Sequence, residues 1–210
     1  MKSAGLSIPI SGWHLDSADW SHDNTVTFTL YNEQLDATVP CTVTMEKTPD
    51  DTWRITGLAD AKGFISDLQA VMNHELDAYN RPVRQKIDAL LTLQNVSAKL
   101  VSDQDKTFLR LSYTPVFHQD REQMAAIKAV YTLRRKSDNA VLYTSPLRLS
   151  TSAERSTYES QFLLNPLIPS QYALISSANI DDTTSTLEVT AITLKDGTEL
   201  AIENDLPQSY

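Results

Sequence analysis

The densest set of side chains able to bind a metal or a ligand lies near the start of the chain. Residues 13–23 read WHLDSADWSHD and hold two histidines and three aspartates. Imidazole and carboxylate groups are ordinary ligands for zinc and other divalent ions. The spacing matches no known ligand motif, so we expect a polar loop without a metal, with its tryptophans packed at a sheet edge.

A small-molecule site is a second hypothesis for this segment. Trp13, His14, Trp20 and His22 would line it together with Trp53, because ligand pockets are rich in aromatic side chains. The alternative, which we favour, is that these aromatic residues, Trp53 among them, pack in the hydrophobic core.

Motifs of known enzymes each lack an essential residue. His74 and Glu75 begin a zinc-protease HExxH motif, but Ala78 stands where the second histidine is required. The five glycines form no GxSxG elbow, Walker loop or dinucleotide fingerprint. His118 and Asp120 share a loop with no nucleophile nearby, and a single cysteine allows no internal disulfide. We therefore expect a protein that is not an enzyme and binds neither metal nor cofactor.

Residues 57–93 organise the elements around these side chains. Apolar residues recur there in steps of three and four, which predicts a long helix with one apolar stripe. Asp60 suits the N-cap of this helix. Pro82 cannot donate an intrahelical hydrogen bond, so we expect a kink there or a restart with Asn80 as the cap.

The last part of the stripe offers a hypothesis about partners. Val83, Ile87, Leu90 and Leu91 could dock a partner helix or a second copy of the chain. The alternative, which we favour, is that they pack on the C-terminal part of the chain, because exposed apolar groups forgo burial energy.

Three strands precede the helix, at residues 25–31, 35–47 and 52–58, and predict an antiparallel meander covered by the stripe. The sequence DTWRITGL at 51–58 resembles the closing hairpin of NTF2-like domains. This resemblance covers about residues 25–58. It implies a secreted or membrane-tethered bacterial protein, with a sheet that can bind small ligands or host isomerase and dehydratase chemistry. NTF2-like domains place helices before the sheet, and none is predicted here, so the alternatives are a missing N-terminal part or an ordinary meander.

The C-terminal part reads as many short strands separated by turns. Candidates are residues 93–101, 107–117, 124–135, 141–143, 147–149, 158–164, 172–176, 185–194 and 198–202. This spacing is typical of an immunoglobulin-like β-sandwich. We therefore predict an α+β chain with two domains, a meander and long kinked helix at 1–92 and a sandwich at 93–210.

Charge and hydropathy limit the partners. A net charge of -9 argues against nucleic acid, because binding phosphates needs clustered Lys and Arg. No apolar run is long enough to span a bilayer. We expect a non-enzymatic binding or assembly module of a bacterial envelope protein, on the periplasmic side of a membrane. The alternatives are a ligand-binding or enzymatic NTF2-like domain, a self-associating scaffold and a cytoplasmic location.

Overall fold

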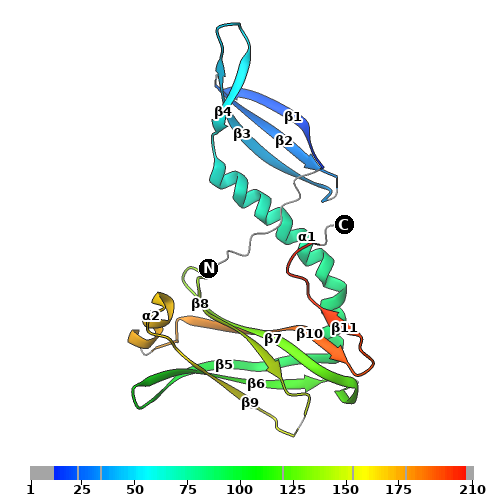
Figure 1. The fold of residues 1–210 in the computed structure, drawn as a ribbon, viewed down its shortest axis with the longest axis vertical. Coiled ribbons are helices and arrows are strands. Elements are labelled where there is room, and N and C mark those ends of the chain that lie inside the picture. The colour runs from blue at the N-terminus through cyan, green and yellow to red at the C-terminus, as the bar shows by residue number, and fades with distance from the viewer. Residues whose placement is uncertain are drawn as a thin grey trace. The chain divides into compact units, whose positions relative to one another are not determined.

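The computed structural model describes residues 12–22, 24–33, 35–119, 121–152, 154–177 and 179–206. Its strands pair antiparallel in three sheets, and two α-helices accompany them (Figure 1), which confirms the predicted α+β class. The chain divides into two compact units, one within Met1–Arg81 and Glu203–Tyr210 and the other within Pro82–Ile202. The sequence predicted a boundary after residue 92, whereas this division falls inside the long helix.

Each unit consists mainly of helices and strands that are consecutive in the sequence. The N-terminal unit holds β1 (Trp13–His22), β2 (Thr25–Asn32), β3 (Ala37–Lys47), β4 (Trp53–Leu58) and most of α1 (Ala61–Leu90). The C-terminal unit holds the end of α1, β5 (Leu91–Asp103), β6 (Lys106–Phe117), η1 (Arg121–Gln123), β7 (Met124–Arg135), β8 (Val141–Leu149), β9 (Tyr158–Leu163), α2 (Pro169–Ser177), β10 (Thr183–Leu194) and β11 (Glu199–Ala201).

The sheet of the N-terminal unit has the order β1-β2-β3-β4. The predicted meander is confirmed as β2, β3 and β4. The prediction of a polar loop at 13–23 is wrong, because β1 pairs with β2 from Trp13 opposite Asn32 to His22 opposite Thr25. Most β1 side chains are exposed, and two register shifts interrupt the pairing of β1 with β2. The strand therefore lacks the alternation of buried and exposed residues by which a strand is recognised in a sequence.

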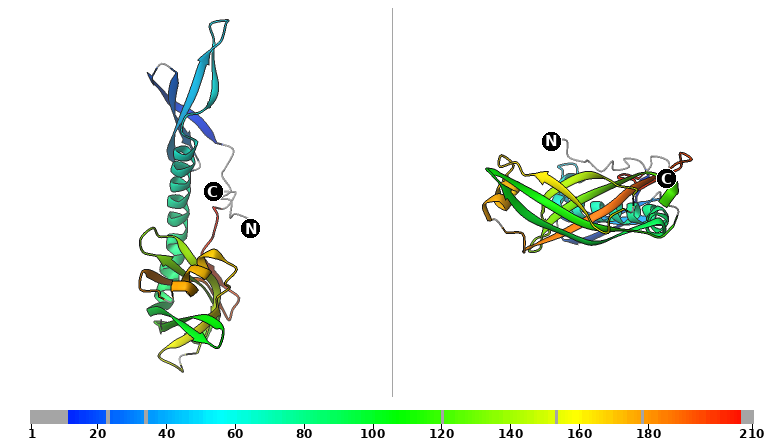
Figure 2. Two further views of the ribbon diagram at one scale, coloured as in Figure 1. Left: turned by 90° about the vertical axis from the view of Figure 1, so that its left-hand side faces the viewer. Right: turned by 90° about the horizontal axis from the view of Figure 1, so that it is seen from below.

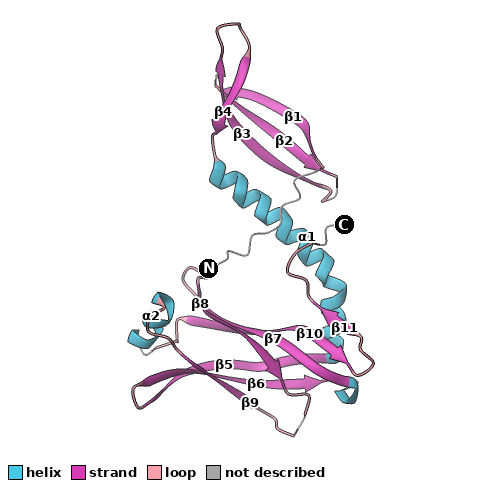
Figure 3. Cartoon of the chain, viewed as in Figure 1, coloured by secondary structure: helices cyan, strands magenta, loops and turns pink. Residues whose placement is uncertain are grey.

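Helix α1 begins directly after Asp60, the residue predicted to be its N-cap. The Asp60 carboxylate accepts a hydrogen bond from the Gly63 backbone N–H, with 2.8 Å between Oδ1 and N. The helix then continues past Pro82 to Leu90 as one element (Figure 3), and the kink stays a prediction.

The prediction that Asn80 caps a restarted helix is wrong. Asn80 is only 2% exposed, and its side chain binds the backbone of Glu203. Asn80 Nδ2 donates to the Glu203 carbonyl oxygen and Asn80 Oδ1 accepts from the Glu203 N–H, both at 2.9 Å. The amide thus ties the end of the chain to α1 within the N-terminal unit.

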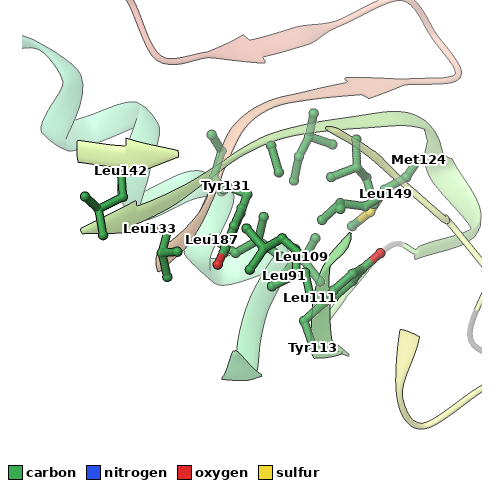
Figure 4. Close-up of a cluster of buried hydrophobic side chains, with 14 of the residues drawn as sticks. Leu91, Leu109, Leu111, Tyr113, Met124, Tyr131, Leu133, Leu142, Leu149 and Leu187 are labelled. Carbon is green, nitrogen blue, oxygen red and sulfur yellow. The ribbon is translucent and has the colours of Figure 1, made fainter. Parts of the chain in front are cut away.

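The C-terminal unit contains two sheets (Figure 2). The strand order is β11-β10-β7-β8 in one and β5-β6-β9 in the other. Both contribute side chains to one core, which includes Leu109 and Leu111 of β6 and Tyr131 and Leu133 of β7 (Figure 4). Tyr131 is fully buried, and its ring stacks on Phe162 of β9 with 5.9 Å between ring centroids. The aromatic pair joins the two sheets.

The four residues considered for docking pack in the core of this unit, as the favoured alternative expected: Ile87 and Leu91 are buried, and Val83 and Leu90 pack against the same cluster. One sequence prediction is wrong in this unit. The strand predicted at 172–176 is wrong, because α2 covers Pro169–Ser177. Proline suits the first helical position, and Leu174 is the one buried residue of this short helix.

Candidate binding surface

The pairing register of the N-terminal sheet places its apolar side chains on one face. Val26, Cys41 and Val43 form the buried cluster on that face, and Leu30 and Met45 pack against it. Residues opposite each other in an antiparallel pair point to the same side of a sheet. Three further apolar residues therefore share this face, since Leu15 lies opposite Leu30, Ile55 opposite Met45 and Leu58 opposite Val43.

Two tryptophans extend the same face. Trp53 is two residues from Ile55 and so points to the same side of β4. Trp20 meets Trp53 edge to face, with ring centroids 6.2 Å apart. The five residues Leu15, Trp20, Trp53, Ile55 and Leu58, which we call the open face, are 56%, 58%, 43%, 58% and 47% exposed.

Helix α1 covers only part of this side of the sheet. Phe64, in the first turn of the helix, packs against the buried cluster, and Leu68 and Met72 are buried. Ile65 on the next position remains 51% exposed. The open face is thus an apolar surface that the described part of its own unit leaves accessible to solvent, as binding surfaces are.

The prediction that Trp53 lies in the core is wrong. The ring does point to the apolar face of the sheet, where it meets Trp20. No described element covers that end of the face, so nearly half of the side chain stays in solvent. Which end of a sheet is covered depends on the path of the helix. The sequence of the strand alone does not determine that path.

The other face of the sheet is lined by hydroxyl groups. The side chains of Thr27 and Thr42 are hydrogen-bonded at 2.9 Å, and those of Thr44 and Thr56 at 3.1 Å. Exposed Thr38 lies opposite Tyr31 on this face. Such residues favour strands and leave their hydroxyls to water or to each other.

The structure separates the residues of the predicted small-molecule site. His14 lies opposite Tyr31 on the hydroxyl-lined face; the two rings meet edge to face, and Glu33 lies 3.7 Å from the imidazole. Trp20 and Trp53 lie on the open face, and Trp13 is half-buried in β1. The side chain of His22 lies outside the described residues. Sequence reasoning missed Leu15, Ile55 and Leu58, which only the register assigns to this surface.

Charge distinguishes the unit that carries the open face. Its positions, 1–81 and 203–210, include fourteen Asp or Glu and five Lys or Arg, whereas positions 82–202 include thirteen of each. The net charge of -9 therefore belongs entirely to the N-terminal unit. Two of its five cations are paired: Lys47, which lies opposite Trp53, contacts Asp51, whereas Arg54 contacts Glu46 on the hydroxyl-lined face.

The remaining candidates are the predicted metal ligands, Cys41 and the loop that holds His118 and Asp120. Among the residues that the structure describes, no three His, Cys, Asp or Glu side chains gather as a metal site would require. Burial raises the pKa of the Cys41 thiol, which keeps it protonated and unreactive. His118 Nε2 lies 2.9 Å from Thr92 Oγ1, while Asp120 lies outside the described residues.

One surface cleft of the C-terminal unit is lined by side chains of both charges. It has a volume of about 530 Å³ and is lined by Arg121, Glu122, Glu154 and Lys195 with Thr151, Ser152 and Met124. Its cations and carboxylates balance, and no histidine or cysteine lines it. Within the described ranges, no helix combines the length and hydropathy of a membrane span.

Comparison with known proteins finds no relative. No protein family, curated protein or solved structure matches this chain. Its function is therefore argued from its own residues.

Proposed function

We propose that this chain is a non-enzymatic binding or assembly module. The observation that carries the proposal is the open face, where five large apolar side chains on one side of one sheet are each more than two-fifths exposed. Single exposed apolar residues are ordinary, but a group on one face marks an interaction surface. Binding a partner there would bury apolar area that the unit leaves in water.

The enzymatic NTF2-like alternative requires a proton-transferring residue beside Trp53. The candidates are His14, Asp16, Asp19 and His22. His14 and Asp19 do not meet this requirement, because their partners Tyr31 and Thr27 are on the hydroxyl-lined face, and the side chain of His22 lies outside the described residues. An acid or base must reach its substrate within hydrogen-bonding distance, so residues on opposite faces of a sheet cannot share one site. The binding module is therefore the better-supported function.

For the C-terminal unit we propose an immunoglobulin-like β-sandwich. Its two sheets, of order β5-β6-β9 and β11-β10-β7-β8, share one core, and each mixes strands from distant parts of the sequence. The stacked Tyr131, on the third strand of the unit, fills the central position where antibody domains carry a tryptophan.

A bacterial envelope location, on the periplasmic side, is proposed on the NTF2-like resemblance alone. Fractionation of source cells tests it, and recovery of the native chain in the cytoplasm would remove it.

The binding function is tested by site-specific cross-linking in the source cells. A photo-reactive amino acid replaces Ile55 on the open face in one variant and Thr38 on the opposite face in a control variant. We expect Ile55 to give one discrete adduct with another protein and Thr38 to give little of it. Equal labelling from both positions, or none from Ile55, would contradict the proposal, and a self-adduct would favour the scaffold.

A further inference from the structure

We infer that β4 receives an extended segment of a partner protein as an added strand of the N-terminal sheet. This inference rests on the proposed binding function and adds the form and the side-chain pattern of the partner. It follows from three features of β4: its place at the edge of the sheet, the direction of its backbone groups and the faces to which its side chains point.

Strand β4 lies at one edge of the sheet. Among the strands that the structure describes, its one neighbour is β3 (Figure 1). Five of its six residues are exposed, so the described part of its own unit leaves this edge open to solvent. An edge strand presents unpaired N–H and C=O groups, to which a strand of another chain can add. The opposite edge, β1, has two register shifts and the exposed Asp16 and Asp19, which disfavour strand addition there.

The pairing with β3 determines which backbone groups of β4 are free. The Met45 N–H donates to the carbonyl oxygen of Asn24, on the β2 side of β3, with 2.9 Å between N and O. Met45 and its partner Ile55 therefore form a pair without hydrogen bonds between them, and so do Lys47 and Trp53 two residues along. The N–H and C=O groups of Trp53 and Ile55 consequently point away from β3, to the free edge.

The side chains of the same strand determine the pattern of the partner. Trp53 and Ile55 belong to the open face, whereas Arg54 between them contacts Glu46 on the hydroxyl-lined face. A strand that pairs with β4 places every second side chain beside the open face and the others beside the hydroxyl-lined face. The partner segment therefore alternates apolar residues with polar ones, and its apolar residues cover exposed parts of Trp53 and Ile55.

A second copy of the chain fits this edge poorly. The register shift after Thr44 makes a bulge at Thr56, so the regular pairing of β4 is limited to the end that begins at Trp53. Antiparallel pairing of two β4 strands would set the regular end of each copy against the bulge of the other. A segment of a different protein can match the regular end alone.

The test uses the full chain and three peptides of about eight residues. The first alternates valine with threonine, the second is the same peptide with N-methyl groups on its valines, and the third has them on its threonines. Neighbouring residues of a strand direct their N–H groups to opposite sides, so only one of the two methylated sets faces β4. We expect one methylated peptide to bind at least about tenfold more weakly than the first peptide and the other to bind within about threefold of it.

Tryptophan fluorescence measures this binding. All three tryptophans, Trp13, Trp20 and Trp53, belong to the N-terminal unit, so their emission reports on the sheet that carries β4.

Two variants of the chain test the free edge itself. Ile55→Pro removes the N–H that points away from β3, and Ile55→Val shortens the side chain but keeps this N–H. Proline is tolerated at an edge position whose N–H faces solvent, so both variants should fold, and unchanged melting curves confirm it. We expect Ile55→Pro to weaken binding of the first peptide by about tenfold or more and Ile55→Val by about threefold or less. If Ile55→Pro does not fold, the methylated peptides decide with the unchanged chain.

Each other outcome overturns the inference. Equal binding of the two methylated peptides, no binding of the first peptide, or equal weakening by both folded variants would mean that β4 does not receive a strand. A dimer by light scattering that Ile55→Pro converts to a monomer would make a second copy the occupant. If the cellular cross-link from Ile55 succeeds while the peptides fail, the binding function stands and only strand addition at β4 is wrong.

Discussion

The two units of the chain differ in how many apolar side chains they bury. The described core of the C-terminal unit has sixteen buried residues drawn from both of its sheets, from α1 and from α2. The described cluster of the N-terminal unit has three, on one face of one sheet. The C-terminal unit therefore has the larger core, whereas the N-terminal unit leaves the apolar side chains of the open face exposed. The N-terminal unit also carries the whole net charge of the chain.

The largest effect we expect comes from the centre of the C-terminal core. Tyr131→Ala removes a fully buried ring that stacks on Phe162 and hydrogen-bonds Ser185 at 3.1 Å. Such truncations cost about 3–5 kcal/mol in free energy of unfolding. Urea unfolding followed by far-UV circular dichroism should show an early transition, while tryptophan fluorescence, which reports the N-terminal unit, should keep its midpoint.

Tyr131→Phe is the control for this prediction. It keeps the ring and removes the hydroxyl, so it should cost about 1 kcal/mol. If tryptophan fluorescence shifts together with circular dichroism in the alanine variant, the two units unfold as one and the contrast between them fails.

A smaller loss should follow from the buried amide of the N-terminal unit. Asn80→Leu removes both hydrogen bonds to the Glu203 backbone and should cost about 1–3 kcal/mol, because those backbone groups lose their partner. Tryptophan fluorescence in urea measures it. Asn80→Asp sets a carboxylate oxygen against the Glu203 carbonyl oxygen in a buried position and should lose at least as much. An unchanged midpoint in Asn80→Leu would show that the tie to Glu203 adds no stability.

Alkaline pH should affect the C-terminal unit through its buried tyrosines. Burial raises the pKa of Tyr113, Tyr131 and Tyr143 above its usual value of 10.0. The unfolded chain then loses these protons at lower pH than the folded one. Stability from this source is complete below pH 10 and declines as pH rises above it.

Urea midpoints by circular dichroism at pH about 8 and about 11 measure this decline. Tyr131→Phe removes one of the three groups and should reduce the difference between the two midpoints. A midpoint difference that the variant leaves unchanged would show that Tyr131 does not contribute to the alkaline loss.

The sequence predicts those features that neighbouring residues determine. The period of two in β2 and β3, the period between three and four in α1 and the cap at Asp60 all depend on local geometry, and all three are confirmed. Asn80 could not be predicted in the same way, because its partner Glu203 lies 123 residues away. Strand β1 was missed because backbone pairing with β2 holds it without burying its side chains.

The candidate surface shows the same limit. The pairing register, which the sequence does not show, assigns Trp53 and Ile55 to the apolar side of the sheet. Whether that side is covered depends on where α1 passes, and the helix reaches the cluster through Phe64 without covering Trp53. Apolar residues of a strand therefore lie in the core of the C-terminal unit, whereas similar residues of β4 lie on an exposed surface of the N-terminal unit.

Trp53→Ala is the smallest and most direct test of this difference. The ring is 43% exposed and its described aromatic contact is the edge of Trp20, so the variant should lose at most about 1 kcal/mol of unfolding free energy. Tryptophan fluorescence from Trp13 and Trp20 still reports the N-terminal unit in urea. The matched comparison is Tyr131→Ala, a large aromatic truncation in the covered core. A loss of about 3 kcal/mol or more at Trp53 would mean that the ring is covered in solution, and the open face would then be part of a core after all.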